Sequence, residues 1–141
     1  MRLVAMALAL AACAHTTTPD TYVRMERIGC LGACPVYTLT LYADGAVQFR
    51  GSWHVPKHTR WGTASRDDVG RLMGGAERVP RWRCDRPRVT DQPAAVITVS
   101  RRGQLTQRIV PDDGDPCTPE SARELEMGID AAGHASQFID K

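Results

Sequence analysis

Apolar and polar residues alternate along five segments of the chain, as in strands with one buried face. In the first, residues 22–28, Val23 and Met25 fall on one side and charged residues on the other. The same period of two runs through residues 36–42, 47–53, 95–100 and 105–110. Turn residues, Asp44-Gly45 and Gly103, separate two consecutive pairs of these segments. We therefore expect five strands, paired mostly as hairpins.

Two other segments carry the period of an amphipathic helix. The first starts at Ser65, where Ser-Arg-Asp-Asp resembles a capping box with Asp in place of Glu. The second starts with Thr118 as N-cap and Pro119 at the first helical position, and Gly133 ends it. The two apolar stripes are Val69, Leu72, Met73 and Ala76 in the first and Ala122, Leu125, Ile129 and Ala132 in the second.

Hairpins with two helices, and no regular alternation of strand and helix, indicate the α+β class. We expect an antiparallel sheet of five or six strands with two helices packed on one face. The length of the chain favours one such domain over residues 22–141.

The first residues resemble a bacterial lipoprotein signal peptide. Arg2 precedes a short apolar run that ends in Leu10-Ala11-Ala12-Cys13, which is similar to a lipobox. The resemblance implies that residues 1–12 are removed and that Cys13 receives diacylglycerol and palmitate. Residues 13–21 then form a lipidated cysteine and a short polar tether, which keeps the domain close to the membrane. In Gram-negative lipoproteins an Asp after the cysteine resembles an inner-membrane retention mark, so Ala14 favours the outer membrane, facing the periplasm.

Other interpretations of this opening stay open. A cut after Ala14 also fits a small-x-small signal and would leave a soluble secreted protein. The apolar run is shorter than the ~20 residues of a membrane-spanning helix, which disfavours a retained anchor, and a buried core helix is disfavoured further. Cysteine parity supports lipidation: of five cysteines, Cys13 would carry lipid and the other four could pair in an oxidising compartment.

Composition narrows the classes of partner. The formal net charge is only +2, which argues against a nucleic-acid partner held by bulk charge. Hydrophobic residues make up 43% of the chain, enough for a core without a metal or a cofactor, and we expect neither.

The four remaining cysteines allow three disulfide pairings. We expect Cys30 to pair with Cys34 inside a tight loop and Cys84 with Cys117, because the second bridge would join two Pro-rich loops that lack regular structure. The alternative is a periplasmic thiol-redox or copper-binding protein that uses Cys30 and Cys34. Together with Pro35 they resemble the C-x-x-x-C-P site of Sco-type copper chaperones, but residues 36–42 favour a strand where those proteins continue toward a helix.

A second resemblance covers most of residues 22–133. Gly29-Cys30-Leu31-Gly32-Ala33-Cys34-Pro35-Val36-Tyr37, followed by the Asp44-Gly45 turn, is similar to an uncharacterised family of bacterial cell-envelope domains with a G-C-x-G-x-C-P-x-Y motif. That family implies a cell-envelope location and no assigned activity.

One charged cluster is a candidate binding site. Five arginines surround a tryptophan, and guanidinium groups of this density bind phosphate or carboxylate groups of an envelope protein or another anionic envelope component. The cluster consists of Arg78, Arg81, Trp82, Arg83, Arg86 and Arg88. The competing interpretation is a solvated loop whose arginines pair with Asp85, Asp91 and the acidic run at residues 112–115.

Enzymatic chemistry finds little support. Ser65 resembles a helix cap more than a nucleophile, the chain has no G-x-S-x-G elbow, and His54 with His58 indicates a hydrated strand end more than a metal pair. We therefore expect a non-enzymatic, membrane-anchored lipoprotein that acts as an interaction or envelope-maintenance module.

Overall fold

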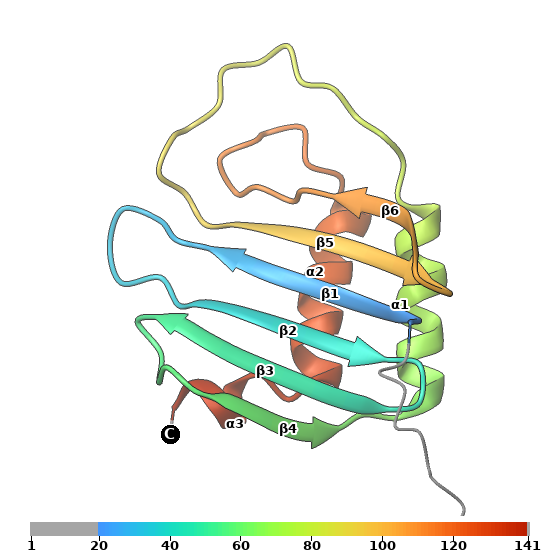
Figure 1. Ribbon diagram of the computed structural model, residues 1–141. Coiled ribbons are helices and arrows are strands. Elements are labelled where there is room, and N and C mark those ends of the chain that lie inside the picture. Colours follow the sequence, from blue (N-terminus) through green and yellow to red (C-terminus); the bar gives the residue numbers. More distant parts are fainter. Residues whose placement is uncertain (1–19, 141) are drawn as a thin grey trace, which may run out of the picture.

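The alternating segments form one antiparallel sheet of six strands (Figure 1). The strands are β1 (Tyr22–Ile28), β2 (Val36–Tyr42), β3 (Ala46–Trp53), β4 (Thr59–Thr63), β5 (Ala94–Arg101) and β6 (Gln104–Ile109). Their order across the sheet is β4-β3-β2-β1-β5-β6, so β4 and β6 are the two edges. The predicted α+β class and the antiparallel sheet are confirmed.

The computed structural model describes residues 20–140. The predicted signal peptide, Cys13 and most of the tether lie outside the described residues. Within residues 20–140, no helix has the length and apolar character needed to cross a membrane.

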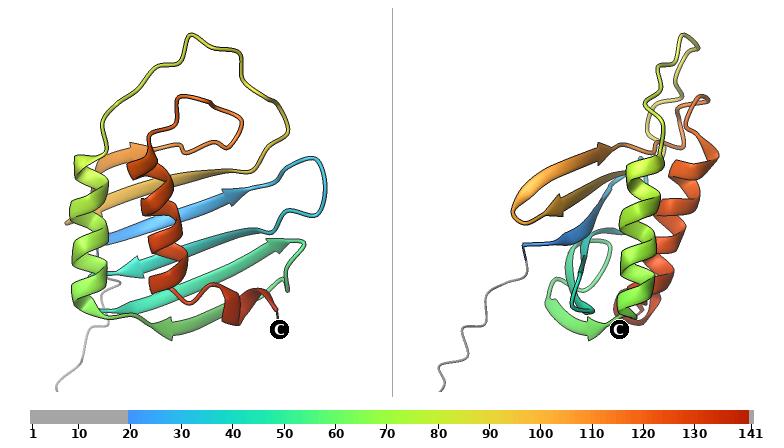
Figure 2. Two further views of the ribbon diagram at one scale, coloured as in Figure 1. Left: turned by 180° about the vertical axis from the view of Figure 1, so that it is seen from behind. Right: turned by 90° about the vertical axis from the view of Figure 1, so that its right-hand side faces the viewer.

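Two long helices cover one face of the sheet and leave the other open (Figure 2). They are α1 (Arg66–Arg78) and α2 (Glu120–Ala132), followed by the short α3 (Ser136–Ile139). Val69, Met73 and Ala76 of α1 are buried. Ala122, Leu125 and Ile129 of α2 are also buried, as the predicted stripe requires.

The core lies between the sheet and the helices. Val23, Met25, Leu39 and Ile97 have no exposed surface, and they come from the strands in the middle of the sheet. Burying one such side chain stabilises the fold by about 1.5–3 kcal/mol. Near the β4 edge of the sheet, Phe138 of α3 stacks on Phe49 of β3 with ring centroids 5.1 Å apart. This contact closes that end of the core.

Strand β4 was not among the expected strands. It lacks the alternation that marks a half-buried strand, because four of its five residues are exposed. Backbone pairing with β3 holds it in place, from Ala46 opposite Thr63 to Arg50 opposite Thr59. Its Trp61 remains 60% exposed and stacks on Tyr42 at 6.2 Å on the open face of the sheet.

The predicted helix caps are confirmed only in part. Ser65 occupies the N-cap of α1 but makes no capping hydrogen bond with its side chain. At α2 the N-cap is Pro119, one residue later than predicted. The Thr118 hydroxyl instead donates to the backbone oxygen of Asp112 at 2.9 Å, so a contact between loop residues replaces the cap.

Candidate anion-binding groove

Two long loops project together beyond β5 and β6 (Figures 1 and 2). They comprise residues 79–93, between α1 and β5, and residues 110–119, between β6 and α2. A disulfide joins Cys84 of the first loop to Cys117 of the second, with Cα atoms 5.4 Å apart. We refer to the pair as the crosslinked loops.

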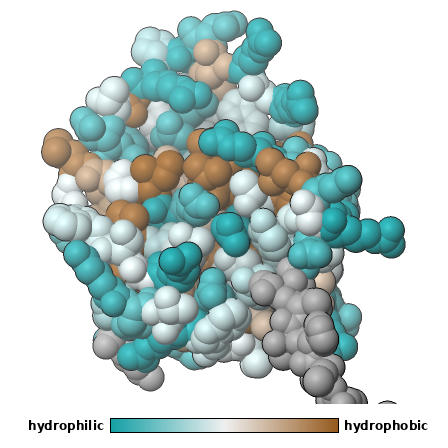
Figure 3. All heavy atoms as spheres, in the orientation of Figure 1, coloured by the Kyte–Doolittle hydropathy of each residue, from teal (hydrophilic) through white to brown (hydrophobic). Residues whose placement is uncertain are grey.

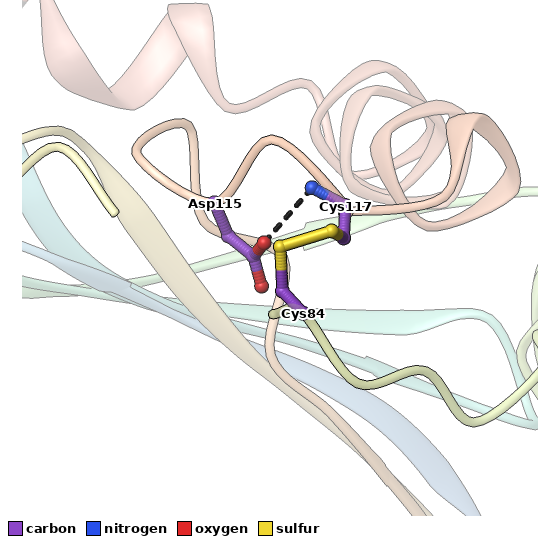
Figure 4. A group of neighbouring side chains, drawn as sticks. All are labelled: Cys84, Asp115 and Cys117. Atoms are coloured by element: carbon purple, nitrogen blue, oxygen red, sulfur yellow. Dashed lines mark hydrogen bonds between the residues drawn. A yellow bond between two sulfur atoms is a disulfide. The ribbon is translucent and has the colours of Figure 1, made fainter. Parts of the chain in front are cut away.

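A buried carboxylate lies beside this disulfide (Figure 4). Asp115 is only 1% exposed and accepts hydrogen bonds from Cys117 N at 2.9 Å, Arg88 Nη2 at 3.0 Å and Trp82 Nε1 at 3.2 Å. These donors offset the cost of burying a charge. The Cys117 N–H first, with Trp82 and Arg88, holds the pKa of Asp115 below its ordinary value.

Backbone contacts also fix the two loops to each other. Val89 N donates to Gly114 O at 2.9 Å, and a β-carbon on Gly114 would lie 1.9 Å from Val89 O. Only glycine therefore allows this approach. Arg86 Nη2 donates to Pro116 O at 2.7 Å from the first loop to the second. The loops are thus one ordered unit despite having no helix or strand of their own.

The same residues do not form a thiolate metal site. Ligand atoms of Cys84, Asp115 and Cys117 lie within 4.8 Å of one another, and Figure 4 shows their arrangement. Both sulfurs are bonded to each other, however, and metal binding requires thiolates. The geometry of this cluster is that of a structural crosslink.

A groove of about 730 Å³ separates the first crosslinked loop from strand β6. One wall is the loop and the other is the strand together with the residue that follows it. The lining residues are Arg81, Trp82, Arg83, Arg88, Leu105, Thr106, Gln107, Arg108, Ile109 and Val110. Four of these are arginines and none is acidic, so we call it the cationic groove.

Most of this positive charge is uncompensated. Arg88 pairs with Asp115 at 3.0 Å and with Asp112 at 3.7 Å. Arg81, Arg83 and Arg108 are exposed, and no ion pair within residues 20–140 involves them. Guanidinium groups arranged in this way bind carboxylates and phosphates through paired N–H donors.

Four of the six residues of the predicted arginine cluster therefore meet at the groove, namely Arg81, Trp82, Arg83 and Arg88. Arg78 lies in the last turn of α1 and Arg86 contacts the second loop, so neither lines the groove. The predicted pairing with the acidic run holds for Arg88. Sequence reasoning missed Arg108, although its polar position in the strand at residues 105–110 could have shown that it is exposed.

The other disulfide lies at the C-terminal end of β1, where Leu31 N donates to Asp91 O of the first crosslinked loop at 3.2 Å. Cys30 and Cys34 are joined in the loop between β1 and β2, with Cα atoms 5.6 Å apart. Leu31 in this loop is 84% exposed. Among residues 20–140, no histidine or carboxylate completes a three-ligand group with these two sulfurs.

Comparison with known proteins identifies a family. A family model described as a domain of unknown function, DUF6438, matches residues 21–133, which include β1 to β6, α1 and α2. The chain belongs to this family. No curated protein and no solved structure matches. The part of the chain that matches the DUF6438 model contains both disulfides and the whole cationic groove.

The DUF6438 domain also holds a partly buried network of charges between β1, β2 and α2. Arg27 forms ion pairs with Glu126 and Asp130, and the Tyr37 hydroxyl donates to Asp130 Oδ1 at 2.7 Å. Burial raises the pKa of Glu126, and burial with the hydrogen bond to Asp130 raises the pKa of Tyr37. Every group faces a partner, so the network fixes α2 on the sheet. Residues two apart in a strand share a face, so the spacing from the buried Met25 could have shown that Arg27 points toward the helices.

A second groove, of about 520 Å³, lies between α1 and α2. Ser65, Ser121 and His134 all line it, together with Asp68 and Glu124. A hydrolase would need a serine hydrogen-bonded to a base. Within residues 20–140, no hydrogen bond joins either hydroxyl to His134 or to these carboxylates.

Proposed function

We propose that this DUF6438 protein is a non-enzymatic lipoprotein of the bacterial cell envelope whose domain binds an anionic partner in the cationic groove. The observation that carries the proposal is that four arginines, from both walls, line one hollow that has no acidic lining residue. The crosslinked loops support it further, because binding groups held by a disulfide and a buried carboxylate lose little conformational entropy when a ligand arrives.

The point where the described chain begins supports this proposal. Lipid on Cys13 would lead through the tether to Asp20, just before β1. Asp20 is held at the β5–β6 turn, where Gly103 N donates to its backbone oxygen at 3.0 Å. The crosslinked loops continue from the other end of β6. A domain tethered at the turn would therefore hold the Leu105 end of the groove near the membrane and point the crosslinked loops away from it.

The test is the binding of two soluble anionic probes, polyglutamate and polygalacturonate, to the purified full-length protein. We expect at least one to bind with an affinity that falls as salt rises, because exposed charges are screened. The double variant Arg81→Glu/Arg83→Glu should bind about tenfold more weakly or worse, since each lost contact becomes a repulsion.

The control is the double variant Arg50→Glu/Arg60→Glu at the opposite edge of the sheet. Arg50 lines a separate hollow of about 500 Å³ that also contains Lys57, so the control removes equal charge from a competing basic surface. Both arginines are exposed. Equal losses in the two variants, or no binding of either probe, would contradict the proposal.

Anchoring has its own test. Mass spectrometry of the mature N-terminus should find diacylglycerol on Cys13, and the variant Cys13→Ser should lose it. Recovery of a chain that begins at Met1 would overturn the lipoprotein assignment.

Thiol titration tests the thiol-redox or copper alternative. Two closed disulfides predict no reactive thiol at the four crosslinked cysteines of protein purified in air. Two free thiols with stoichiometric Cu(I) uptake would favour the alternative.

A further inference from the structure

We propose that the ligand of the cationic groove is an acidic, extended segment of another protein, which adds to the sheet beside β6. This inference rests on the proposed function and names the class of anion. The added segment would become a seventh strand, and its carboxylates would face the arginines of the crosslinked loop.

Strand β6 lies at the edge of the sheet. It ends the sheet order and has β5 as its only strand partner in the described chain. In an antiparallel edge strand, every second residue directs its N–H and C=O groups away from the neighbouring strand. Those groups are the ones that bind an added strand in β-augmentation.

The cationic groove follows this edge. Gln107 turns toward the helices, where its Nε2 donates to Ala76 O at 3.2 Å, whereas Arg108 is exposed. Both residues line the groove, as does every residue from Leu105 to Val110. A hollow lined by all residues of a strand runs along its edge rather than over one face. Its length, roughly 20 Å for six residues, suits a short extended segment.

The positive charge of the groove favours an acidic segment. Arg108 lies on the edge strand itself, and Arg81, Arg83 and Arg88 line the opposite wall. A second copy of β6 would bring another Arg108 into this field, so self-pairing is disfavoured. An acidic strand would pair with the free backbone groups of β6, and its carboxylates would bind the arginines of the groove. Figure 3 shows hydrophilic side chains over the projecting loops beside a hydrophobic band over the upper strands, and the exposed Leu105 adds an apolar contact for such a segment.

The opposite edge of the sheet, strand β4, lacks this combination of an edge strand and an arginine-lined groove. Phe138 of α3 packs against Gly62 of β4, and a β-carbon on Gly62 would lie 3.2 Å from the Phe138 ring. The hollow near that edge is lined by only two basic side chains other than histidine, Arg50 and Lys57. The structure therefore favours β6 over β4 as the site of strand addition.

The experiment compares three synthetic peptides of equal length, long enough to span β6, on the full-length protein. The first alternates threonine with glutamate, the second has the same sequence with alternate backbone amides N-methylated, and the third alternates threonine with lysine. N-methylation leaves every carboxylate in place but removes the donors of a strand ladder. We expect the first peptide to bind at least about tenfold more tightly than the other two.

Hydrogen exchange supplies the second measurement. The unmodified acidic peptide should slow the exchange of alternate amides in β6, and Arg81→Glu/Arg83→Glu should abolish this protection while Arg50→Glu/Arg60→Glu retains it. Equal affinity for the N-methylated peptide would overturn strand addition and leave the anion-binding proposal intact. If polygalacturonate binds but no acidic peptide does, the groove binds a polysaccharide and the inference is wrong. If no anion binds, both proposals fail.

Discussion

Two glycines show how strongly single residues decide the shape of the crosslinked loops. Gly114 is buried in the second loop, where a β-carbon would lie 1.9 Å from the backbone oxygen of Val89. Gly70 is exposed on α1, and a β-carbon there would meet nothing within 4 Å. The same substitution should therefore have opposite effects at the two positions.

We predict that Gly114→Ala lowers the free energy of unfolding by about 2 kcal/mol or more, because the backbone of one loop must move away from the other. Gly70→Ala should raise it by about 0.5–1 kcal/mol, since alanine loses less backbone entropy in a helix. Urea unfolding at neutral pH measures both. An unchanged free energy of unfolding in Gly114→Ala would contradict the close packing of the loops.

Asp115 makes the stability of the folded protein depend on pH. Because its pKa is lowered in the folded protein, its ionised form stabilises the fold above the ordinary Asp pKa of about 3.9. That contribution is lost as the pH falls through the lowered pKa. We predict that Asp115→Asn is less stable than wild type at neutral pH and that the difference narrows below about pH 4. Asp85→Asn, at an exposed position of the first loop, is the control.

At the scale of elements, the two disulfides differ in the length of chain that they close. Cys84–Cys117 spans 33 positions, whereas Cys30–Cys34 spans 4. A longer closed loop restricts the unfolded chain more. We predict that Cys84→Ser/Cys117→Ser lowers the free energy of unfolding by about 4 kcal/mol and Cys30→Ser/Cys34→Ser by about 2 kcal/mol. Only the first pair should also weaken anion binding in the groove.

The elements also show what sequence could and could not predict. The strands β1, β2, β3, β5 and β6 follow from alternation, and both long helices follow from their apolar stripes. Strand β4 could not be found in this way, because backbone pairing rather than burial holds it. Thr118 bonds to the loop residue Asp112 instead of capping α2, a choice that depends on tertiary structure.

The groove was predictable only in part for the same reason. The arginine cluster is visible in the sequence, but its partner wall is strand β6, more than twenty residues away from Arg81. Which arginines stay unpaired depends on how the loops fold back, since Asp115 binds Arg88 and leaves Arg81 and Arg83 exposed.

On the scale of the whole molecule, the sheet has one face covered by helices and one open, and its β6 edge lies beside the crosslinked loops (Figure 2). The N-terminal end of the described chain is held at the β5–β6 turn through Asp20 and Gly103. If Cys13 carries the proposed lipid, the tether would reach the domain at one end of β6, and the cationic groove runs along the edge of β6 toward the other end.

The most direct test of the anion-binding groove is an NMR titration of the full-length protein with polyglutamate. We predict that backbone amide signals of residues 81–88 and 105–110 shift together and saturate, and that the shifts disappear in Arg81→Glu/Arg83→Glu. Shifts that instead follow Arg50, Lys57 and the β3–β4 end of the sheet, or that spread evenly over all exposed arginines, would contradict the account.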